Sequence, residues 1–169
     1  MIKNLSYFLQ LVLANLRDHA ESPKRFFTMS FVMFFQNVLF FLIWIVLLEV
    51  ASDLNGWGIT EIAYLFGLIS FVFGINNFFF AGIRYLPLML ESGEVDAYLT
   101  KPRHPLIPIM CSSTGMSAVG DILFGPCIWL LYADFVWSDV PMLLLLTCLS
   151  AILLTSAIVF VYSMSLWLK

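Results

Sequence analysis

Charged residues are scarce in this chain, and their scarcity excludes most classes of soluble protein. Only 11% of the 169 residues are charged, whereas 62% are hydrophobic. In an ordinary soluble domain, about a quarter of the residues are charged. The few basic residues form no stripe of the kind that binds nucleic acid, so no nucleic-acid partner is expected. The composition therefore predicts a membrane protein.

Residues that carry catalytic or cofactor chemistry are missing or isolated. No sequence of the form G-x-x-x-x-G-K-S/T occurs to hold a nucleotide phosphate. His19 and His104 have no second ligand at a metal-binding spacing, and the three cysteines lie in apolar stretches, where free thiols are expected. We therefore expect no catalytic residue, no metal and no cofactor in this chain.

The chain does contain four long apolar stretches, at residues 26–48, 62–83, 106–133 and 140–168. Each is long enough to cross the hydrocarbon core of a bilayer, which needs about 20 residues. Because lipid offers the backbone no hydrogen-bond partner, the spans should be helices. The predicted fold is all-α, a polytopic helical bundle with four transmembrane helices. One face of the second stretch is predicted to pack closely, because it carries the small residues Ala63, Gly67, Ser70 and Gly74.

All eight Lys and Arg residues fall on one side of these stretches. They precede the first stretch, lie between the second and third, or follow the fourth. The other two connections, residues 49–61 and 134–139, contain acidic residues but no basic one. Since short loops rich in Lys and Arg stay in the cytoplasm, residues 1–25, 84–105 and 169 are predicted to be cytoplasmic.

The N-terminal segment, residues 1–25, does not resemble a cleaved signal peptide. Apolar residues recur in it at helical spacing, at Leu5, Phe8, Leu9, Val12, Leu13 and Leu16. Polar residues occupy other positions, which is the pattern of an amphipathic helix lying in the membrane interface. Pro23 is expected to mark the bend into the first span.

The polar or ionisable side chains well inside the predicted spans include Gln36, Asn37, Asn76, Asn77 and Asp121. An ionised carboxylate at mid-membrane costs at least about 2.5 to 3.5 kcal/mol, so Asp121 should face the bundle interior. There it would either lock two helices as a hydrogen-bonded group or serve proton linkage or cation contact. Gln36 and Asn37 would either hydrogen-bond neighbouring helices or line a substrate pathway.

The connection between the second and third stretches carries a short predicted helix. Gly93 favours a turn, Ser92 would cap the helix, and Pro102 would end it. The charged residues of this segment are Glu91, Glu94, Asp96 and Lys101. Its apolar residues are predicted to share one face and are Val95, Tyr98 and Leu99. On these grounds the segment is either a plain interfacial turn or a docking surface for a partner.

Residues 92–106, which read S-G-E-V-D-A-Y-L-T-K-P-R-H-P-L, resemble the signature of bacterial ABC type-2 permeases. In one branch of that family, a run close to S-G-E-L-D-x-Y-L-L-R-P-x-N-P-L joins spans two and three. Further likeness to that branch lies in Gly56-Trp57 followed by Glu61 and Tyr64, and in Gly120-Asp121. Two departures are Lys101 in place of the usual Arg, which removes a bidentate donor, and His104 in place of Asn.

The resemblance implies the membrane-spanning permease subunit of an ABC exporter. Its substrate would be hydrophobic or amphipathic, and its transport would be driven by ATP hydrolysis on a separate ATPase subunit. Residues 2–20 would form a connecting helix, and Glu91 to Lys101 a coupling helix that docks onto the ATPase. A second permease subunit, identical or different, would complete the pathway in the bacterial inner membrane. Because family members typically have six spans, a chain with four is expected to be a truncated or partial permease.

Two other interpretations compete with transport. The first is a small four-span membrane scaffold or accessory protein that binds partners without moving a solute. The second is a membrane-embedded enzyme, which the lack of paired acids and metal ligands disfavours. A nearby encoded ATPase with a phosphate-binding loop would separate the permease from both.

Cysteine labelling of intact cells tests the predicted topology, in a background without the native cysteines. Asn55→Cys should react with a membrane-impermeant maleimide, whereas Ser92→Cys should react only after the membrane is permeabilised. The reason is that every Lys and Arg lies on the predicted cytoplasmic side. Strong labelling at position 92 in intact cells, with none at position 55, would reverse the orientation.

Overall fold

The described part of the chain folds into helices and their connections. The computed structural model describes residues 8, 10–17, 22–50, 56–100, 105–134, 136–164 and 167, and no strand occurs among them. Residues 10–17 are helical, and the elements that follow are α2 (Pro23–Val50), α3 (Ile59–Phe80), η1 (Ala81–Tyr85), α4 (Leu86–Ser92), α5 (Asp96–Leu99), α6 (Leu106–Met110), α7 (Ala118–Tyr132), η2 (Trp137–Asp139) and α8 (Val140–Ser163). The predicted all-α class is therefore confirmed.

Three helical segments are long and apolar enough to cross a membrane. They are Pro23–Val50, Ile59–Ser92 and Trp137–Ser163. The second of these joins α3, η1 and α4 into 34 helical residues. At 1.5 Å per residue this segment is roughly 50 Å long, well beyond the roughly 30 Å of a hydrocarbon core. The segment is therefore longer than a hydrocarbon core is thick.

The predicted third span differs from the expected continuous helix over residues 106–133. It is divided into α6 and α7, and residues 111–117 between them are not α-helical. The break contains several hydroxyl side chains, which can bond to nearby backbone groups, and the Ser112 hydroxyl donates to the carbonyl of Ile109 at 2.9 Å. Tertiary contact fixes it, because the Gly115 N–H donates to the carbonyl of Asn77 on α3 at 2.9 Å. The remaining helix, α7, has 15 residues, fewer than the roughly 20 of a full span.

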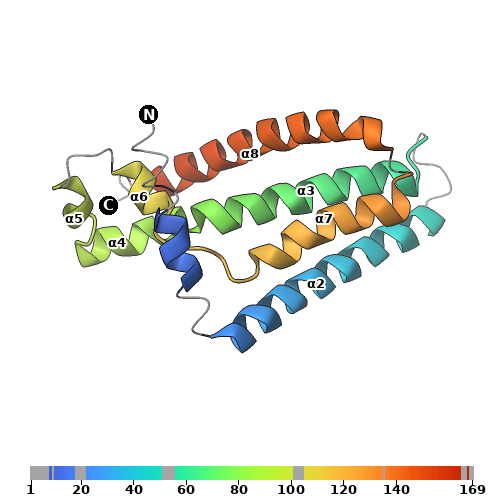
Figure 1. Ribbon diagram of the computed structural model, residues 1–169. Helices are drawn as coiled ribbons and strands as arrows, with labels where there is room; N and C mark the ends of the chain where they lie inside the picture. Colours follow the sequence, from blue (N-terminus) through green and yellow to red (C-terminus); the bar gives the residue numbers. More distant parts are fainter. Residues whose placement is uncertain are drawn as a thin grey trace.

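The bundle is organised around α3. Figure 1 shows α3 flanked by α7 and α8, with α2 on the far side of α7. The small residues predicted to form a smooth face on α3 are all buried, and α7 occupies that face. From α7, Phe124, Ile128 and Trp129 fill the core together with Phe41 of α2 and Ile62 of α3.

A second buried cluster lies at the end of the bundle that carries α4 and α6 (Figure 1). Its centre consists of Ile83, Leu86, Ile109, Met110 and Cys111. The N-terminal helix packs against it through Phe8 and Leu11, and Asn15 donates a hydrogen bond to the carbonyl of Cys111 at 2.9 Å. The described part of the predicted interfacial helix is therefore held against the bundle by both apolar and polar contacts. We call this group of elements the platform.

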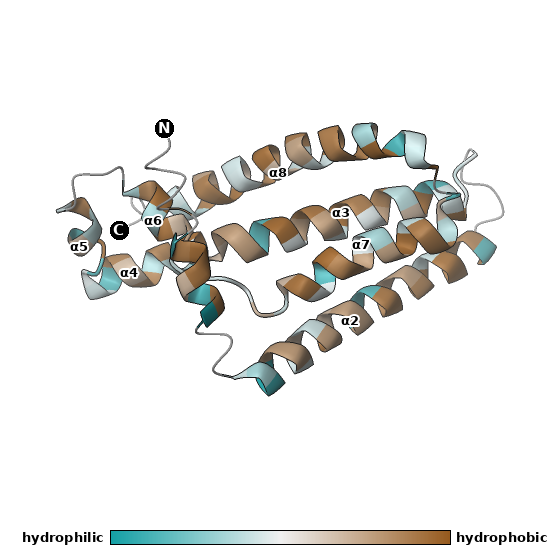
Figure 2. Cartoon of the chain, in the orientation of Figure 1, coloured by the Kyte–Doolittle hydropathy of each residue, from teal (hydrophilic) through white to brown (hydrophobic). Residues whose placement is uncertain are grey.

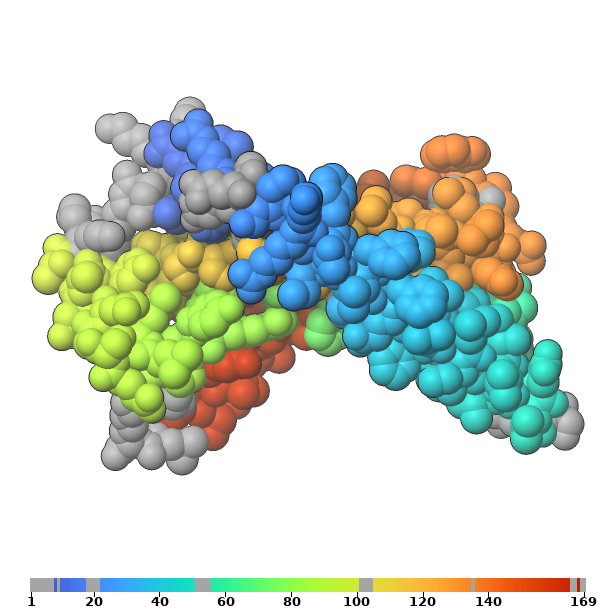
Figure 3. All heavy atoms as spheres, turned by 90° about the horizontal axis from the view of Figure 1, so that it is seen from below, coloured from blue at the N-terminus to red at the C-terminus, as the bar shows by residue number. Residues whose placement is uncertain are grey.

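The outward faces of α2 and α8 are apolar and uncovered. Figure 2 shows hydrophobic residues along both helices, and the space-filling view of Figure 3 shows α2 lying along one open face. Phe27 and Phe31 on α2 are 70% and 68% exposed, and Leu153 on α8 is 71% exposed. Apolar surface of this extent suits contact with lipid or with another membrane protein.

Substitution of Gly74 tests the close contact between α3 and α7. A Cβ at this position would lie 2.7 Å from the backbone nitrogen of Ile122 and 2.9 Å from the Cβ of Asp121. Because backbone atoms cannot move aside cheaply, Gly74→Val should destabilise the fold by about 1–3 kcal/mol. The measurement is the thermal unfolding temperature in detergent. Ala157→Val, on the exposed face of α8, is the matched control and should leave that temperature nearly unchanged; equal stability of both variants would contradict the contact.

Candidate functional site

The predicted coupling segment begins as the end of a longer helix. Glu91 and Ser92 complete α4, and Gly93 ends it in the left-handed conformation with φ 76°. Ser92 therefore does not cap the following helix as expected, and its hydroxyl instead donates to the carbonyl of Met89 at 3.3 Å. After a turn at residues 93–95, α5 runs only from Asp96 to Leu99. The expected single helix from Glu91 to Lys101 is thus two short elements with a glycine bend, and Lys101 and Pro102 lie outside the described residues.

The predicted apolar face of this segment is divided between the platform and the surface. Val95 and Tyr98 are partly buried, and both pack against the second cluster. Leu99 is 61% exposed. Glu91, Glu94 and Asp96 are exposed as well. The described part of the segment therefore exposes Leu99 and three acidic side chains, while Val95 and Tyr98 fasten it to the bundle.

Asp121 and Asn37 form a buried pair between α7 and α2. Asp121 is 3% exposed and Asn37 is 7% exposed. The amide of Asn37 donates a hydrogen bond to a carboxyl oxygen of Asp121 at 2.7 Å. The preceding residue, Gly120, lies against the backbone of Ser30 and Phe34 on α2, so a side chain there would push the two helices apart. This geometry is that of a polar lock between two helices.

Asn76 makes a second polar contact, between α3 and α8. It is 1% exposed, and its amide donates to the hydroxyl of Thr155 at 2.7 Å. The Thr155 hydroxyl in turn donates to the carbonyl of Ala151 in its own helix, also at 2.7 Å. Both groups are satisfied within the bundle, as buried polar groups require.

Asn77 joins α3 to the irregular segment 111–117 and to Arg84. A guanidinium N–H of Arg84 donates to the amide oxygen of Asn77 at 3.1 Å, and the Asn77 amide donates to the hydroxyl of Ser117 at 3.5 Å. The sequence analysis did not pair Arg84 with Asn77. The spacing of the two residues could have indicated this pair, because residues seven positions apart in a helix lie two turns apart on the same face.

Gln36 does not join these contacts. It is exposed on α2, although its neighbour Asn37 is buried. Successive residues on a helix point about 100° apart, so only one of the two amides can face α7. The two predicted intramembrane amides of α2 therefore have different surroundings.

The polar groups of the described residues link helices to one another. No group of three or more His, Cys, Asp or Glu side chains that could hold a metal ion occurs among them. What the arrangement supports is mechanical linkage: α2 to α7 through Asn37 and Asp121, and α3 to α8 through Asn76.

The pair of Asp121 and Asn37 generates a stability prediction. Asp121→Leu removes the acceptor and leaves the Asn37 amide buried without its partner, which should cost about 1–3 kcal/mol. Asp121→Asn keeps an acceptor oxygen and should cost less. The measurement is thermal unfolding in detergent and in lipid, with Leu123→Ala on the exposed face of α7 as control. Adding Asn37→Leu to Asp121→Leu should recover part of the loss; an unchanged unfolding temperature for Asp121→Leu would rule the lock out.

Comparison with known proteins identifies one family that matches most of the chain. No curated protein sequence and no solved structure matches the chain. A family of sequences described as ABC-2 family transporter protein matches residues 31–169, which include the segment around α5 and the whole of α7. Membership of this family, together with the long apolar helices, indicates an integral membrane protein that is a permease component of an ABC transporter. Such a component is normally a non-catalytic subunit that associates with an ABC ATPase. The chain belongs to the ABC-2 transporter family.

Proposed function

We propose that the chain is the membrane-spanning permease subunit of an ABC exporter. It would transport a hydrophobic or amphipathic substrate, driven by ATP hydrolysis on a separate subunit. The observation that carries this proposal is the exposed segment of α4 and α5 at the end of the long helix Ile59–Ser92. Its exposed Leu99 and surrounding carboxylates are suited to a groove with a basic rim. We assign the ATPase contact to this segment.

The proposed coupling is mechanical. Closure of two ATPase subunits on ATP would displace the α4–α5 segment of each permease subunit. Since α3, η1 and α4 are continuous, the displacement passes along α3 into the bundle. From α3 it reaches α7 through the close contact at Gly67 and Gly74, and α8 through Asn76. ATP binding and hydrolysis would thereby shift the population between inward-open and outward-open arrangements.

A second permease subunit is part of the proposal, and Gln36 supports it. Its amide is exposed on α2 among the apolar side chains Phe31, Val32 and Phe35, each more than half exposed. A polar amide that faces hydrocarbon has no hydrogen-bond partner there, whereas a neighbouring helix can provide one. The face of α2 that carries Gln36 is therefore the proposed contact with a second subunit. The proposed location is the bacterial inner membrane, with both termini in the cytoplasm.

Leu99→Ala tests the ATPase contact. An exposed anchor that is buried in an interface contributes roughly 2 kcal/mol or more, so the variant should bind the cognate ATPase at least about tenfold more weakly. Co-purification of the full permease with that ATPase, and stimulation of ATP hydrolysis by transport substrate, are the measurements. Stability should not change, since Leu99 is 61% exposed in the free chain.

Three further variants sharpen this test. Leu153→Ala removes an equally exposed leucine from α8 and should leave the ATPase bound. Lys101→Ala should have a smaller effect than Leu99→Ala. Tyr98→Ala should lower the unfolding temperature as well as ATPase binding, because Tyr98 packs against the platform. Retention of the ATPase at wild-type level by the double variant Tyr98→Ala, Leu99→Ala would exclude this segment as the coupling element.

A further inference from the structure

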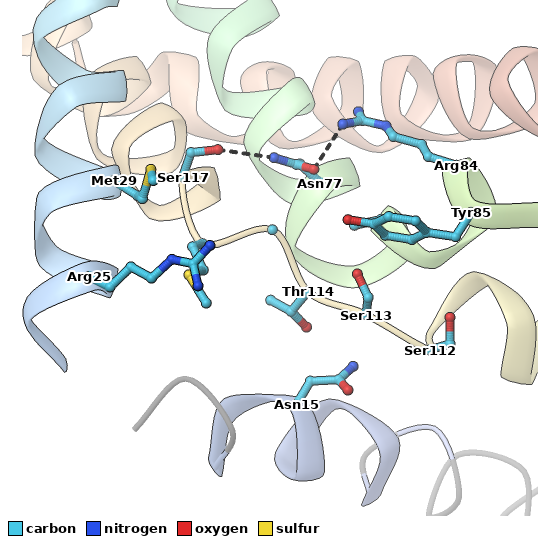
Figure 4. Close-up of a pocket in the computed structure, with 13 residues that line it drawn as sticks. Asn15, Arg25, Met29, Asn77, Arg84, Tyr85, Ser112, Ser113, Thr114 and Ser117 are labelled. Atoms are coloured by element: carbon cyan, nitrogen blue, oxygen red, sulfur yellow. Dashed lines mark hydrogen bonds between the residues drawn. The ribbon is translucent and has the colours of Figure 1, made fainter. Parts of the chain in front are cut away.

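A polar cavity lies beside the platform, where α2 begins. Its volume is about 540 Å³, within the range of about 300–1,000 Å³ that ligand pockets usually have. Figure 4 shows that four parts of the chain enclose it: the N-terminal helix with Asn15, α2 with Arg25, the end of α3 with its continuation at Arg84 and Tyr85, and residues 112–117. The break between α6 and α7 therefore forms one wall of this cavity.

Among the described residues, the charged side chains that line the cavity are all positive. Of the 13 residues that line the cavity, two are arginines and none is acidic. In the part of the chain that the structure describes, neither Arg25 nor Arg84 forms an ion pair with a carboxylate, although Asp121 acts on Arg84 electrostatically from deeper in the bundle. Guanidinium groups are fork-shaped donors that match phosphate oxygens. Two such groups that form no ion pair with a described carboxylate favour a bound oxyanion.

Several donors in the cavity remain available. Arg84 uses one N–H on Asn77, which leaves its other N–H groups free of the described hydrogen bonds. Arg25 extends from α2 toward residues 112–117 (Figure 4) and makes no hydrogen bond to any described residue. The hydroxyls of Ser113 and Tyr85 likewise have no partner among the described residues.

The walls of the cavity are held in place before any ligand arrives. Asn15 is bonded to the carbonyl of Cys111, and the Ser30 hydroxyl donates to the carbonyl of Met116 at 2.9 Å. The Gly115 N–H donates to the carbonyl of Asn77. A ligand would therefore lose little free energy to ordering these segments.

The surroundings suggest where the ligand comes from. Exposed apolar side chains continue along α2 from the cavity, beginning with Phe27 and Phe31. An amphiphile could place its charged group between the arginines and its chain along this face. A free anion could reach the same arginines from the cytoplasmic side, because Arg25 is exposed.

We infer that this cavity binds a phosphate-type oxyanion between Arg25 and Arg84, supplied either by the headgroup of an anionic amphiphile or as the free anion. The inference goes beyond the proposed function, since it requires neither the ATPase nor a second permease subunit. Arg25 is the main charged contact, and Arg84 both contacts the anion and holds Asn77 in place.

The experiment titrates the purified full chain, in a neutral detergent at constant ionic strength, with three probes. They are inorganic phosphate, dihexanoyl phosphatidic acid and, as the zwitterionic control, dihexanoyl phosphatidylcholine. The readout is the dissociation constant from calorimetry, checked by the shift in unfolding temperature. We expect saturable binding of one or both phosphomonoester probes, and binding of the phosphatidylcholine at least tenfold weaker. Tighter binding of phosphatidic acid than of inorganic phosphate assigns the site to a lipid headgroup, whereas equal binding assigns it to the free oxyanion.

Matched variants decide whether the arginines form the site. Arg25→Gln removes a charge-assisted contact and should weaken binding about tenfold or more. Lys24→Gln removes an adjacent exposed charge that does not line the cavity and should change the dissociation constant less than twofold. Arg84→Lys should bind better than Arg84→Gln. Absence of saturable binding, equal affinity of Arg25→Gln and wild type, or an equal loss in Lys24→Gln would each overturn the inference.

Discussion

The close contact between α3 and α7 positions most of the structure. Gly67 and Gly74 on α3 leave room for Trp129, Ile128 and Ile122 of α7, and Gly125 of α7 lies against the backbone carbonyl of Gly67. Without a strong hydrophobic force between helices in lipid, such backbone proximity and the hydrogen bonds it permits hold a membrane bundle together. Because α7 is held in this way, Asp121 reaches α2 and bonds to Asn37. The residues between α6 and α7, 111–117, depart from the helix.

That departure from the helix has a second consequence. In a simple four-span bundle, residues 111–117 would be helical, and their backbone groups would pair within the helix. As irregular backbone, the same groups would be costly if they faced hydrocarbon. Here they are bonded to Asn77, Ser30 and Asn15 instead. The irregular backbone is therefore tolerated because protein covers it, and the covering groups form the walls of the arginine-lined cavity. One interruption thus shortens α7 and creates a polar site beside the platform.

The proposed function and the cavity involve neighbouring parts of the same long helical segment. α4 carries the segment assigned to the ATPase, whereas Asn77 and Arg84, near the end of α3, line the cavity. In the proposed coupling, a force on α4 would pass along η1, where Arg84 is bonded to Asn77, and also directly to α8, against which α4 packs. An oxyanion bound to Arg84 would therefore lie on the proposed path of coupling and could affect transport by the proposed exporter.

The sequence by itself determined the helical class, the membrane location and the family likeness of residues 92–106, because these depend on composition, run length and local motif. It also indicated that Asp121 needs a partner and that one face of α3 packs closely. It did not indicate that Asn37 is that partner, that Gln36 points outward, or that Val95 and Tyr98 face the platform while Leu99 faces away. Nor did it indicate the break at residues 111–117, where a long stretch was predicted to be one continuous helix. Those features were decided by the tertiary structure, because helical periodicity gives the relative angle of side chains on one helix but not which neighbouring helix, or no helix at all, lies opposite them.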